Sequence, residues 1–489
     1  MKPPLLSITT LWSIHDVNKK GSSITWSAHL LDITISWWVT KRILIDFGMH
    51  IGDVITENNN KFLPIDPTTW HELDPKSIDV MMLTHAHNDH VWRIPTLVGK
   101  WYDKSLFMTT QSKNVLYPIL MDSINVQEQN IKREKEKTKS TRRNLYHNSS
   151  NPHFMGAWNG MIKQRIQKSL SNNSISSMPQ TLFTQEDVYK TLNQVKSFPY
   201  YETWNTKTLF KVFDDTDAVK AKFIDAGHIF GSSMILFEIT NDNKEVFSLL
   251  RTGDIGRVNN RIYGRPPTIN GITNRVINLI AMESTYAGKP PHPNIHQEIG
   301  SMIDYSNHIF QQWGRVIMPC FTQTRFQEML LYLTNAKKSG VLPSNTEIIA
   351  DSPLAKDILG IMNDYDKNYT DLNKSIKRLS GDEIVKTFLN WEEQKNMIFV
   401  VSGGMLQWWT IMKLVYYLDQ LDSKKMEHFN LELAKKSGII ISGYLPEWSL
   451  WDKILKSPTQ YNAHKITLST HSDHDGIVDF ITNAWWNNG

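Results

Sequence analysis

Short apolar runs alternate with turns and helical stretches from Lys41 onward, a pattern typical of layered α/β structure. Most of these runs end in a small or polar cluster, and active-site groups tend to collect at such strand ends. Ten runs rich in apolar and β-branched residues predict strands, at 42–48, 79–85, 222–228, 246–254, 277–285, 315–321, 347–352, 397–404, 438–444 and 465–471.

The segment 128–180 breaks this pattern. The run IKREKEKTKSTRR (131–143) is heavily charged, and stretches rich in asparagine and serine follow it. A solvated helix followed by a loop is the simpler interpretation. The alternative is an arm that contacts RNA, because clustered lysine and arginine neutralise phosphates.

Composition adds a few limits. The chain has 489 residues, a net charge of +4 and a single cysteine, Cys320. At roughly 150 residues per domain, several domains are expected. The mild positive charge permits an anionic partner such as nucleic acid without requiring one. One cysteine excludes an internal disulfide, and the N-terminus has no apolar run that suits a signal peptide or a membrane span. We therefore expect a cytoplasmic protein without a membrane segment.

The motif HAHNDH is the strongest chemical signal. It places four metal-ligating side chains directly after an apolar strand: His85, His87, Asp89 and His90. In an extended chain alternate residues share a face, so several of these groups can converge. Imidazoles and a carboxylate together suit zinc or a similar divalent ion. A histidine-rich surface turn is the alternative, and the position after a buried strand argues against it.

Four ligands this close together indicate two neighbouring metal ions that need further ligands. Two candidates stand at later strand ends, His228 in DAGH and Asp254 in RTGD. A carboxylate such as Asp254 can bridge two cations, which lie ~3.5–4 Å apart in two-metal hydrolytic sites. Asp46 in LIDFG is a candidate for orienting the ligands without binding metal itself.

These segments resemble a known family. HxHxDH followed by AGH and TGD is similar to the metallo-β-lactamase fold, and several later segments resemble the β-CASP nucleases of that superfamily: AMESTYAG, MPCFTQTRFQEMLLYL, ADSPLA, VSGGMLQ, ISGYLPE and LSTHSDHDG. The resemblance implies an α/β fold in which a metallo-β-lactamase αββα sandwich is interrupted by a Rossmann-like β-CASP cap. The expected domains are a core over 1–286 with the insertion 128–180, a cap over 287–440, and a return to the core over 441–489.

The resemblance also implies a ligand set. His85, His87 and His228 would bind one zinc ion, Asp89 and His90 a second, and Asp254 would bridge the two. Two Zn²⁺ are therefore the expected cofactors, with Mn²⁺ as the alternative because it accepts similar ligands.

Three residues are the candidate catalytic groups, and Asp89 is one of them. Glu283 and His471 match the first and second β-CASP motifs and would act as a general-acid pair, in which the carboxylate orients the imidazole that protonates the leaving oxygen. Ser402, Gly403 and Gly404 follow a cap strand. Their backbone N–H groups are candidates for holding phosphate, with a plain tight turn as the alternative.

The sequence departs from the family in two ways. The family's third motif supplies a histidine to the second metal, but this sequence ends at Gly489 before such a motif. We expect either that the protein lacks this ligand or that the sequence is a fragment.

The second departure is an excess of tryptophan, 17 residues against 24 glycines. Several stand where the family pattern favours glycine: Trp12, Trp26, at least one of Trp37 and Trp38, Trp92, Trp408, Trp409, Trp448 and Trp451. Our hypothesis is that many are UGA codons translated as tryptophan, from an organism that decodes UGA as glycine. The alternative is genuine tryptophan, packed in a rearranged core or stacked on bases.

The leading functional prediction is a zinc-dependent ribonuclease acting in RNA processing or decay, on single-stranded RNA. A DNA nuclease of the same class is one alternative, and a lactonase- or thioesterase-like hydrolase is another, although the cap segment argues against it. A third is a catalytically silent RNA-binding scaffold, which would be expected to have lost metal ligands. Internal cutting and end trimming both stay open, as does a homodimer.

Overall fold

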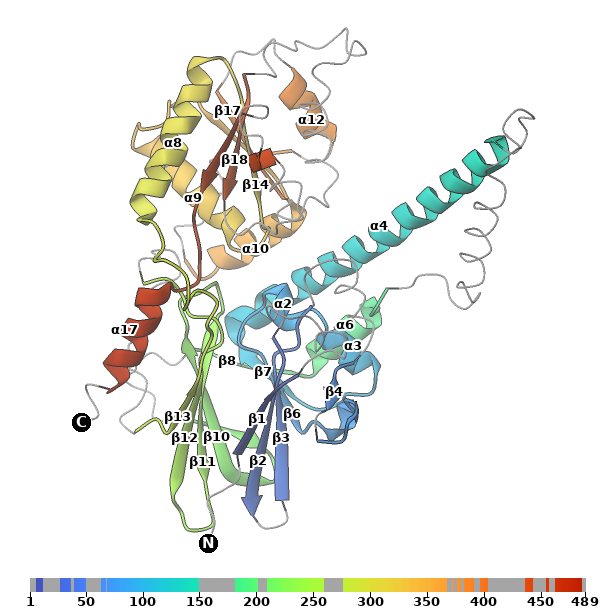
Figure 1. Ribbon diagram of the computed structural model, residues 1–489, viewed down its shortest axis with the longest axis vertical. Coiled ribbons are helices and arrows are strands. Elements are labelled where there is room, and N and C mark those ends of the chain that lie inside the picture. The colour runs from blue at the N-terminus through green and yellow to red at the C-terminus, as the bar shows by residue number, and fades with distance from the viewer. Residues whose placement is uncertain are drawn as a thin grey trace.

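The structure is a computed structural model that describes residues 6–11, 27–36, 39–49, 63–66, 68–148, 181–200, 209–258, 276–366, 372, 376–379, 382–390, 396–402, 436–442, 454–456 and 462–485. Each of the ten predicted runs overlaps an observed strand. The elements form two bodies, a core of two stacked sheets and a cap built on a third sheet (Figure 1).

The first core sheet contains six strands, in the order β1 (Leu6–Thr10), β2 (His29–Ser36), β3 (Val39–Ile45), β6 (Val80–Met82), β7 (Leu106–Thr109) and β8 (Val195–Phe198). Successive side chains point to opposite faces of the sheet, as in any β-strand. Leu31 and Ile43 face the second sheet, whereas Leu30 and Leu44 join the cluster under the helices. Both faces of this sheet are therefore covered.

The second core sheet has the order β13 (Leu279–Ala281), β12 (Val246–Arg251), β11 (Ser233–Thr240), β10 (Thr216–Asp225) and β9 (Phe210–Phe213). Ile235 and Phe237 pack against the first sheet, in the same apolar cluster as its inward residues. Met234 and Leu236 point the other way and share a cluster with Phe480 of α17 (His474–Trp485). This order of layers confirms the predicted αββα sandwich.

The helices α2 (Asn88–Val91), α3 (Ile94–Gly99), α4 (Thr110–Asn148) and α6 (Gln185–Asn193) belong to the core. Helix α4 has 39 residues and extends far beyond the sandwich (Figure 1). The charged run 131–143 lies within this extension, which confirms that this run is helical. Residues 149–180 lie outside the described residues, so the RNA-contacting arm stays a prediction.

The cap sheet is parallel throughout, with the order β16 (Lys377–Arg378), β15 (Glu347–Asp351), β17 (Met397–Ser402), β14 (Val316–Cys320), β18 (Gly438–Ser442) and β19 (Ala463–Ile466). One face carries α8 (Ile295–Gln311), α9 (Arg325–Lys338) and α10 (Pro353–Asn363), and the other carries α12 (Asp382–Leu389). Parallel sheets are stable when both faces are covered, and this arrangement is the predicted Rossmann-like cap.

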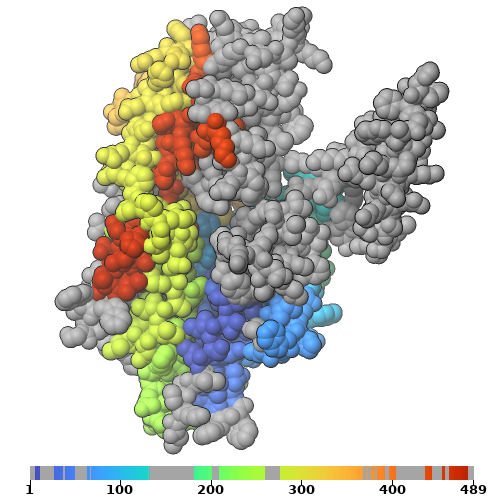
Figure 2. Space-filling view, in the orientation of Figure 1, coloured from blue at the N-terminus to red at the C-terminus, as the bar shows by residue number. Residues whose placement is uncertain are grey.

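The expected boundary between the cap and the returning core, at 440, falls inside β18. Strands β18 and β19 both pair within the cap sheet, which therefore extends to Ile466. Beyond it, His471 pairs with Gly256 of the core. The returning segment that ends in α17 lies beside the chain that leaves β13 for the cap, as the space-filling view shows (Figure 2). We therefore propose a cap over 287–466.

The long helix α4 is too polar to cross a bilayer, and no other helix among the described residues combines the length and apolar character of a membrane span.

Candidate metal centre

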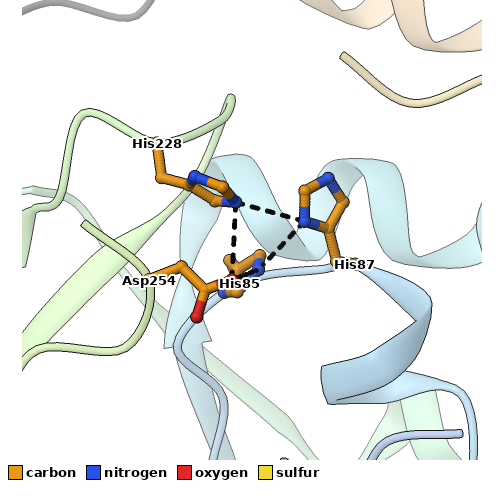
Figure 3. A group of neighbouring side chains, drawn as sticks. All are labelled: His85, His87, His228 and Asp254. Atoms are coloured by element: carbon orange, nitrogen blue, oxygen red, sulfur yellow. Dashed lines mark hydrogen bonds and ion pairs between the residues drawn. The ribbon is translucent and has the colours of Figure 1, made fainter. Parts of the chain in front are cut away.

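Four side chains converge at the loop end of the sandwich. His85 and His87 lie between β6 and α2, His228 follows β10, and Asp254 follows β12 (Figure 3). Each of their ligating atoms lies within 4.8 Å of the others. Both core sheets therefore contribute to one site, which the sequence analysis predicted from strand ends alone.

The distances suit a divalent cation. His87 Nδ1 lies 3.1 Å from His85 Nε2 and 3.3 Å from His228 Nε2. Asp254 Oδ2 lies 3.5 Å from Nε2 of both His85 and His228. Neighbouring ligand atoms around a tetrahedral ion with bonds of ~2.0–2.1 Å are themselves about 3.4 Å apart. Three imidazole nitrogens and a carboxylate oxygen at this spacing fit zinc or a similar ion.

Burial keeps these three imidazoles in the neutral form that binds a metal ion. It lowers the pKa of His85 and of His228 well below the usual value for histidine, and it lowers the pKa of His87 to about 4. The rings are therefore neutral at physiological pH. Because a metal binds only the deprotonated nitrogen, no proton has to be displaced from these three ligands near neutral pH.

A second group of predicted ligands lies on the other side of Asp254. His90 Nε2 is 3.4 Å from Asp254 Oδ2 and 3.9 Å from Asp89 Oδ2. Burial alone would lower the pKa of His90, but the carboxylates of Asp254, Asp46 and Asp89 outweigh burial and raise it. The same oxygen of Asp254 thus faces both groups of ligands, which is the position that a bridging carboxylate needs.

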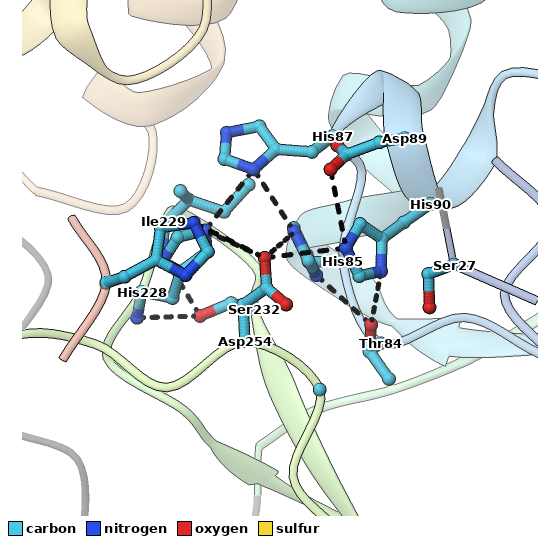
Figure 4. A network of polar contacts seen from close by, with 12 residues as sticks. Ser27, Thr84, His85, His87, Asp89, His90, His228, Ile229, Ser232 and Asp254 are labelled. Carbon is cyan, nitrogen blue, oxygen red and sulfur yellow. Dashed lines mark hydrogen bonds and ion pairs between the residues drawn. The ribbon is translucent and has the colours of Figure 1, made fainter. Parts of the chain in front are cut away.

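Asp46 holds the ligand loop from below. Its carboxylate accepts hydrogen bonds from Thr84 N at 2.8 Å and from Thr84 Oγ1 at 2.9 Å, and lies 2.9 Å from His90 Nδ1. The Thr84 hydroxyl in turn lies 3.1 Å from His85 Nδ1 (Figure 4). These contacts orient two imidazoles, in the way carboxylates commonly support histidine ligands. Sequence analysis missed Thr84, although it directly precedes the histidine motif.

Two glycines permit the loops to pass this closely. A Cβ added at Gly48 would lie 1.6 Å from the carbonyl oxygen of Asp89, and one at Gly256 would lie 1.9 Å from that of Gly227. Any side chain at either position would push a ligand-bearing loop away from the site. Glycine is required here for close backbone approach.

Glu283 and His471 meet from opposite ends of the inserted cap. Glu283 Oε2 lies 2.9 Å from His471 Nδ1, and His471 Nε2 lies 3.8 Å from Asp254 Oδ2. Ile255 N donates to the other carboxylate oxygen of Glu283. Burial lowers the pKa of His471, but Glu283 and Asp254 outweigh it and raise the value to about 9. The imidazole of His471, paired with Glu283, thus retains a proton next to the predicted metal ligands.

A half-buried cation that the sequence analysis missed lies beneath the site. Arg251 is on β12, and its Nη2 lies 2.7 Å from His29 Nε2. Burial, followed by the Arg251 charge, lowers the pKa of His29 to about 2. Arg251 is the first residue of the RTGD segment, but the sequence does not show which groups its side chain meets, so only the three-dimensional arrangement identifies it as a positive charge near Asp46, Asp254 and Glu283.

The predicted phosphate-binding turn is only partly described. Ser402 is the buried last residue of β17 and is paired in register with Cys320. Gly403 and Gly404 lie outside the described residues, so their role stays a prediction.

The αββα sandwich with a histidine–aspartate cluster at its loop end agrees with the predicted fold. A family model described as "Metallo-beta-lactamase superfamily" matches residues 34–108. This match confirms the predicted resemblance to the metallo-β-lactamase fold in that part of the core.

Relatives extend the similarity over the cap. The chain is 24% identical to "Ribonuclease TTHA0252" of Thermus thermophilus, over 94% of this chain and 88% of that protein. It is 23% identical to the "RNase J-like protein" of Methanocaldococcus jannaschii, over 89% and 86%. It is 22% identical to "Endoribonuclease YSH1" of Gibberella zeae over 91% of this chain, but it spans only 45% of that relative. These relatives confirm the resemblance to β-CASP ribonucleases.

Proposed function

We propose that the protein is a ribonuclease that hydrolyses RNA phosphodiester bonds in RNA processing or decay. One observation carries the proposal. The ligand cluster and the Glu283–His471 pair converge on the same oxygen, Asp254 Oδ2. A metal ion that activates water and a proton donor for the leaving oxygen would therefore face the same phosphodiester group of the substrate. The names of the similar proteins supply the substrate class.

The proposed cofactors are two zinc ions, with manganese as the alternative. His85, His87 and His228 would bind one ion and Asp89 and His90 the other, with Asp254 shared. When bound, such ions supply hydroxide at neutral pH and stabilise the charge of the crowded phosphorane-like transition state.

The residues of the chain supply the remaining chemistry. Glu283 fixes the His471 ring through Nδ1, which leaves Nε2 facing the ligand cluster. A ribose oxygen leaves poorly unless it is protonated, and an imidazolium at this position donates that proton. Asp46 and Thr84 keep the ligand rings in orientation during the reaction.

Three alternatives make different predictions. A DNA nuclease would cut a deoxyribose strand at least as fast as RNA. A lactonase- or thioesterase-like hydrolase would have no use for the Glu283–His471 pair beside the cap. A silent scaffold would be expected to have lost metal ligands, whereas the sequence retains all six predicted ligands, and four of them, His85, His87, His228 and Asp254, lie close enough together to hold one ion.

The test is cleavage of an end-labelled single-stranded RNA, followed on a denaturing gel with zinc and with a chelator. We expect metal-dependent cutting that a His87→Ala variant loses, and the product ladder will distinguish internal cutting from end trimming. Faster cutting of a matched DNA strand would support the DNA alternative, and no cutting by folded, zinc-loaded protein would overturn the proposal. Cleavage of a duplex RNA under the same conditions tests the expected preference for single strands. Light scattering measures the mass of the protein in solution and so tests the expected homodimer.

A further inference from the structure

One loop of the cap reaches into the metal centre. It comprises residues 321–324 and joins β14 to α9, whose first residue is Arg325. The side-chain amide of Gln323 donates to the backbone carbonyl of Ala86 across a distance of 3.0 Å. Ala86 stands between His85 and His87 in the ligand loop, so this hydrogen bond ties the cap directly to the two ligand-bearing residues.

The backbone beside Gln323 is strained. Thr324 has φ +70° and ψ −66°, and Arg325 N donates to Gln323 O at 2.8 Å. This is the rare γ-turn with positive φ, which is unfavourable for a residue with a side chain. Strained conformations of this kind persist where the surrounding structure enforces them, and they concentrate at functional sites.

The same turn places a second contact on the other half of the site. Arg325 is buried, forms an ion pair with Glu328 and donates through Nη2 to the carbonyl of Leu468 at 2.6 Å. Leu468 precedes His471 by three residues. Because the chain reverses at Thr324, consecutive contacts of one loop reach the ligand loop and the segment that carries the proton donor.

We propose that Gln323 is a positioning residue for metal binding. Its amide holds the carbonyl of Ala86 and so fixes the spacing of the imidazoles of His85 and His87, and the strained turn at Thr324 directs the amide there. In this arrangement the cap completes the metal centre as well as covering it. The effect on turnover rests on the proposed ribonuclease function, whereas the effect on metal affinity does not.

The test compares Gln323→Leu, which keeps the side-chain size and removes the donor, with Gln194→Leu. Gln194 likewise donates to a backbone carbonyl, that of Tyr102 at 2.9 Å, away from the metal centre. Zinc affinity is measured by competition with a chromophoric chelator, and kcat and KM are measured on an RNA oligonucleotide. We expect Gln323→Leu to weaken zinc binding roughly tenfold, the lower end for outer contacts of metal ligands, and to lower kcat with KM unchanged.

Gln194→Leu should change neither quantity, although both variants lower the melting temperature slightly. Gln323→Ala, which adds no bulk, covers the case in which the leucine variant does not fold. Zinc affinity and kcat within twofold of the parent in a folded Gln323 variant would overturn the proposal. If the parent binds zinc but cuts no RNA, the proposed function fails while the affinity comparison still decides the role of Gln323.

A separate observation concerns tryptophan. Five tryptophans lie in the described part of the chain, and three of them have positive φ: Trp70 at +58°, Trp101 at +79° and Trp313 at +65°. Their side chains are also exposed, by 79%, 76% and 57%. Positive φ is uncommon for any residue other than glycine and is a clear outlier for a bulky one. None of the three was among the tryptophans that the family pattern singled out.

Two of these positions end helices in the same way. After α3, Trp101 N donates to Val98 O and the next residue's N–H bonds Leu97 O. After α8, Trp313 N donates to Phe310 O and the following N–H bonds Ile309 O. This is the Schellman motif, in which the residue with positive φ is usually glycine.

Helix α9 provides the natural comparison. Gly340 has φ +78°, its N–H donates to Lys337 O, and Val341 N donates to Ala336 O. The geometry repeats that of Trp101 and Trp313, with glycine in the place of tryptophan. Trp70 closes the short hairpin between β4 (Ile65–Asp66) and β5 (His71–Glu72), another turn position that favours glycine.

We infer that the natural residue at positions 70, 101 and 313 is glycine. Trp92 differs, because its φ is −60° and its ring packs 5.6 Å from that of Phe183, so its backbone does not require glycine. The inference therefore rests on the three backbone conformations and not on the family pattern.

Mass spectrometry of peptides from the protein in its source organism tests this inference directly. We expect the glycine mass at all three positions, and the tryptophan mass at them would overturn it. In recombinant protein, Trp101→Gly and Trp313→Gly should each raise the melting temperature by about 2 °C or more, because αL strain is relieved. Trp101→Ala should give no comparable rise, and Gly340→Trp should lower it.

Discussion

The ligand half and the acid half of the candidate active site each contain a histidine of intermediate exposure, His87 and His471, and the pKa values of these two shift in opposite directions. In the ligand half, burial among other imidazoles lowers the pKa of His87 to about 4. In the acid half, the carboxylate of Glu283 at 2.9 Å overrides burial and raises the pKa of His471 to about 9. Burial alone therefore does not decide what a histidine does. The nearest charged partner decides whether the ring offers a lone pair or holds a proton.

The halves also differ in how they are assembled. The three imidazoles and Asp254 come from loops of one sandwich, whereas Glu283 and His471 stand at the two junctions with the cap. The ligand half can form once the two core sheets have stacked. The acid half requires in addition that the chain has completed the cap and returned to pair with Gly256.

The largest expected effect comes from the residue that both halves share. Asp254→Asn removes the charge that faces His85, His90, His228 and His471. We expect metal content to fall and RNA cleavage to drop at least ~10³-fold, the scale for losing a principal electrostatic contribution. Asp79→Asn, at the far end of the first sheet, is the control. If Asp254→Asn keeps both its metal content and its RNA cleavage within tenfold of the parent, Asp254 does not serve both halves of the site.

Removing only the proton donor distinguishes the two halves. We expect His471→Ala to retain metal and to cut RNA about 10²- to 10³-fold more slowly, the usual contribution of a general acid. A phosphodiester with a nitrophenol leaving group needs no protonation, so its hydrolysis should be nearly unchanged. His464→Ala, at a histidine on cap strand β19 away from the metal centre, serves as control. An equal loss on both substrates would contradict the assignment of His471 as the acid.

The ligand half could be predicted from sequence almost completely, since HAHNDH is local and His228 and Asp254 end strands with clear apolar patterns. The pairing of Glu283 with His471 came only from the resemblance, because 188 residues separate them and no periodicity links them. Contacts such as those of Thr84 and Gln323 were beyond reach, because single hydrogen bonds between loops leave no pattern. The boundary at 440 came from the resemblance, and the pairing of β18 and β19 with the cap sheet, on which we base the later boundary, is visible only in the structure.

A moderate effect is expected from Asp46, which touches ligands but is not one. Asp46→Asn keeps the side-chain size and weakens the hydrogen bonds to Thr84 and His90. We expect metal affinity to fall ~10- to 100-fold, as for other carboxylates behind histidine ligands. Chelator competition measures it. Asp66→Asn, a buried carboxylate paired with Arg42 in the same half of the core, should lower stability without changing metal affinity. Unchanged metal affinity in Asp46→Asn would show that Asp46 does not support the metal ligands.

The smallest effect isolates the pairing within the acid half. The pKa of His471 is about 9 in the folded metal-free protein against 6.5 for an unperturbed histidine. Folding therefore favours the protonated ring. The Glu283–His471 pair stabilises the fold fully below pH 6.5, and this contribution is lost as the pH rises through 9.

Glu283→Gln removes the charge of the partner, so the pKa of His471 falls. Urea unfolding of metal-free parent and variant should show a difference in free energy of at most about 3 kcal/mol at pH 6, shrinking toward zero by pH 10. In the metal-loaded enzyme the alkaline limb of kcat should move to lower pH for the same reason. A stability difference that is constant from pH 6 to pH 10 would mean that Glu283 supports the loop through Ile255 rather than by holding the proton on His471.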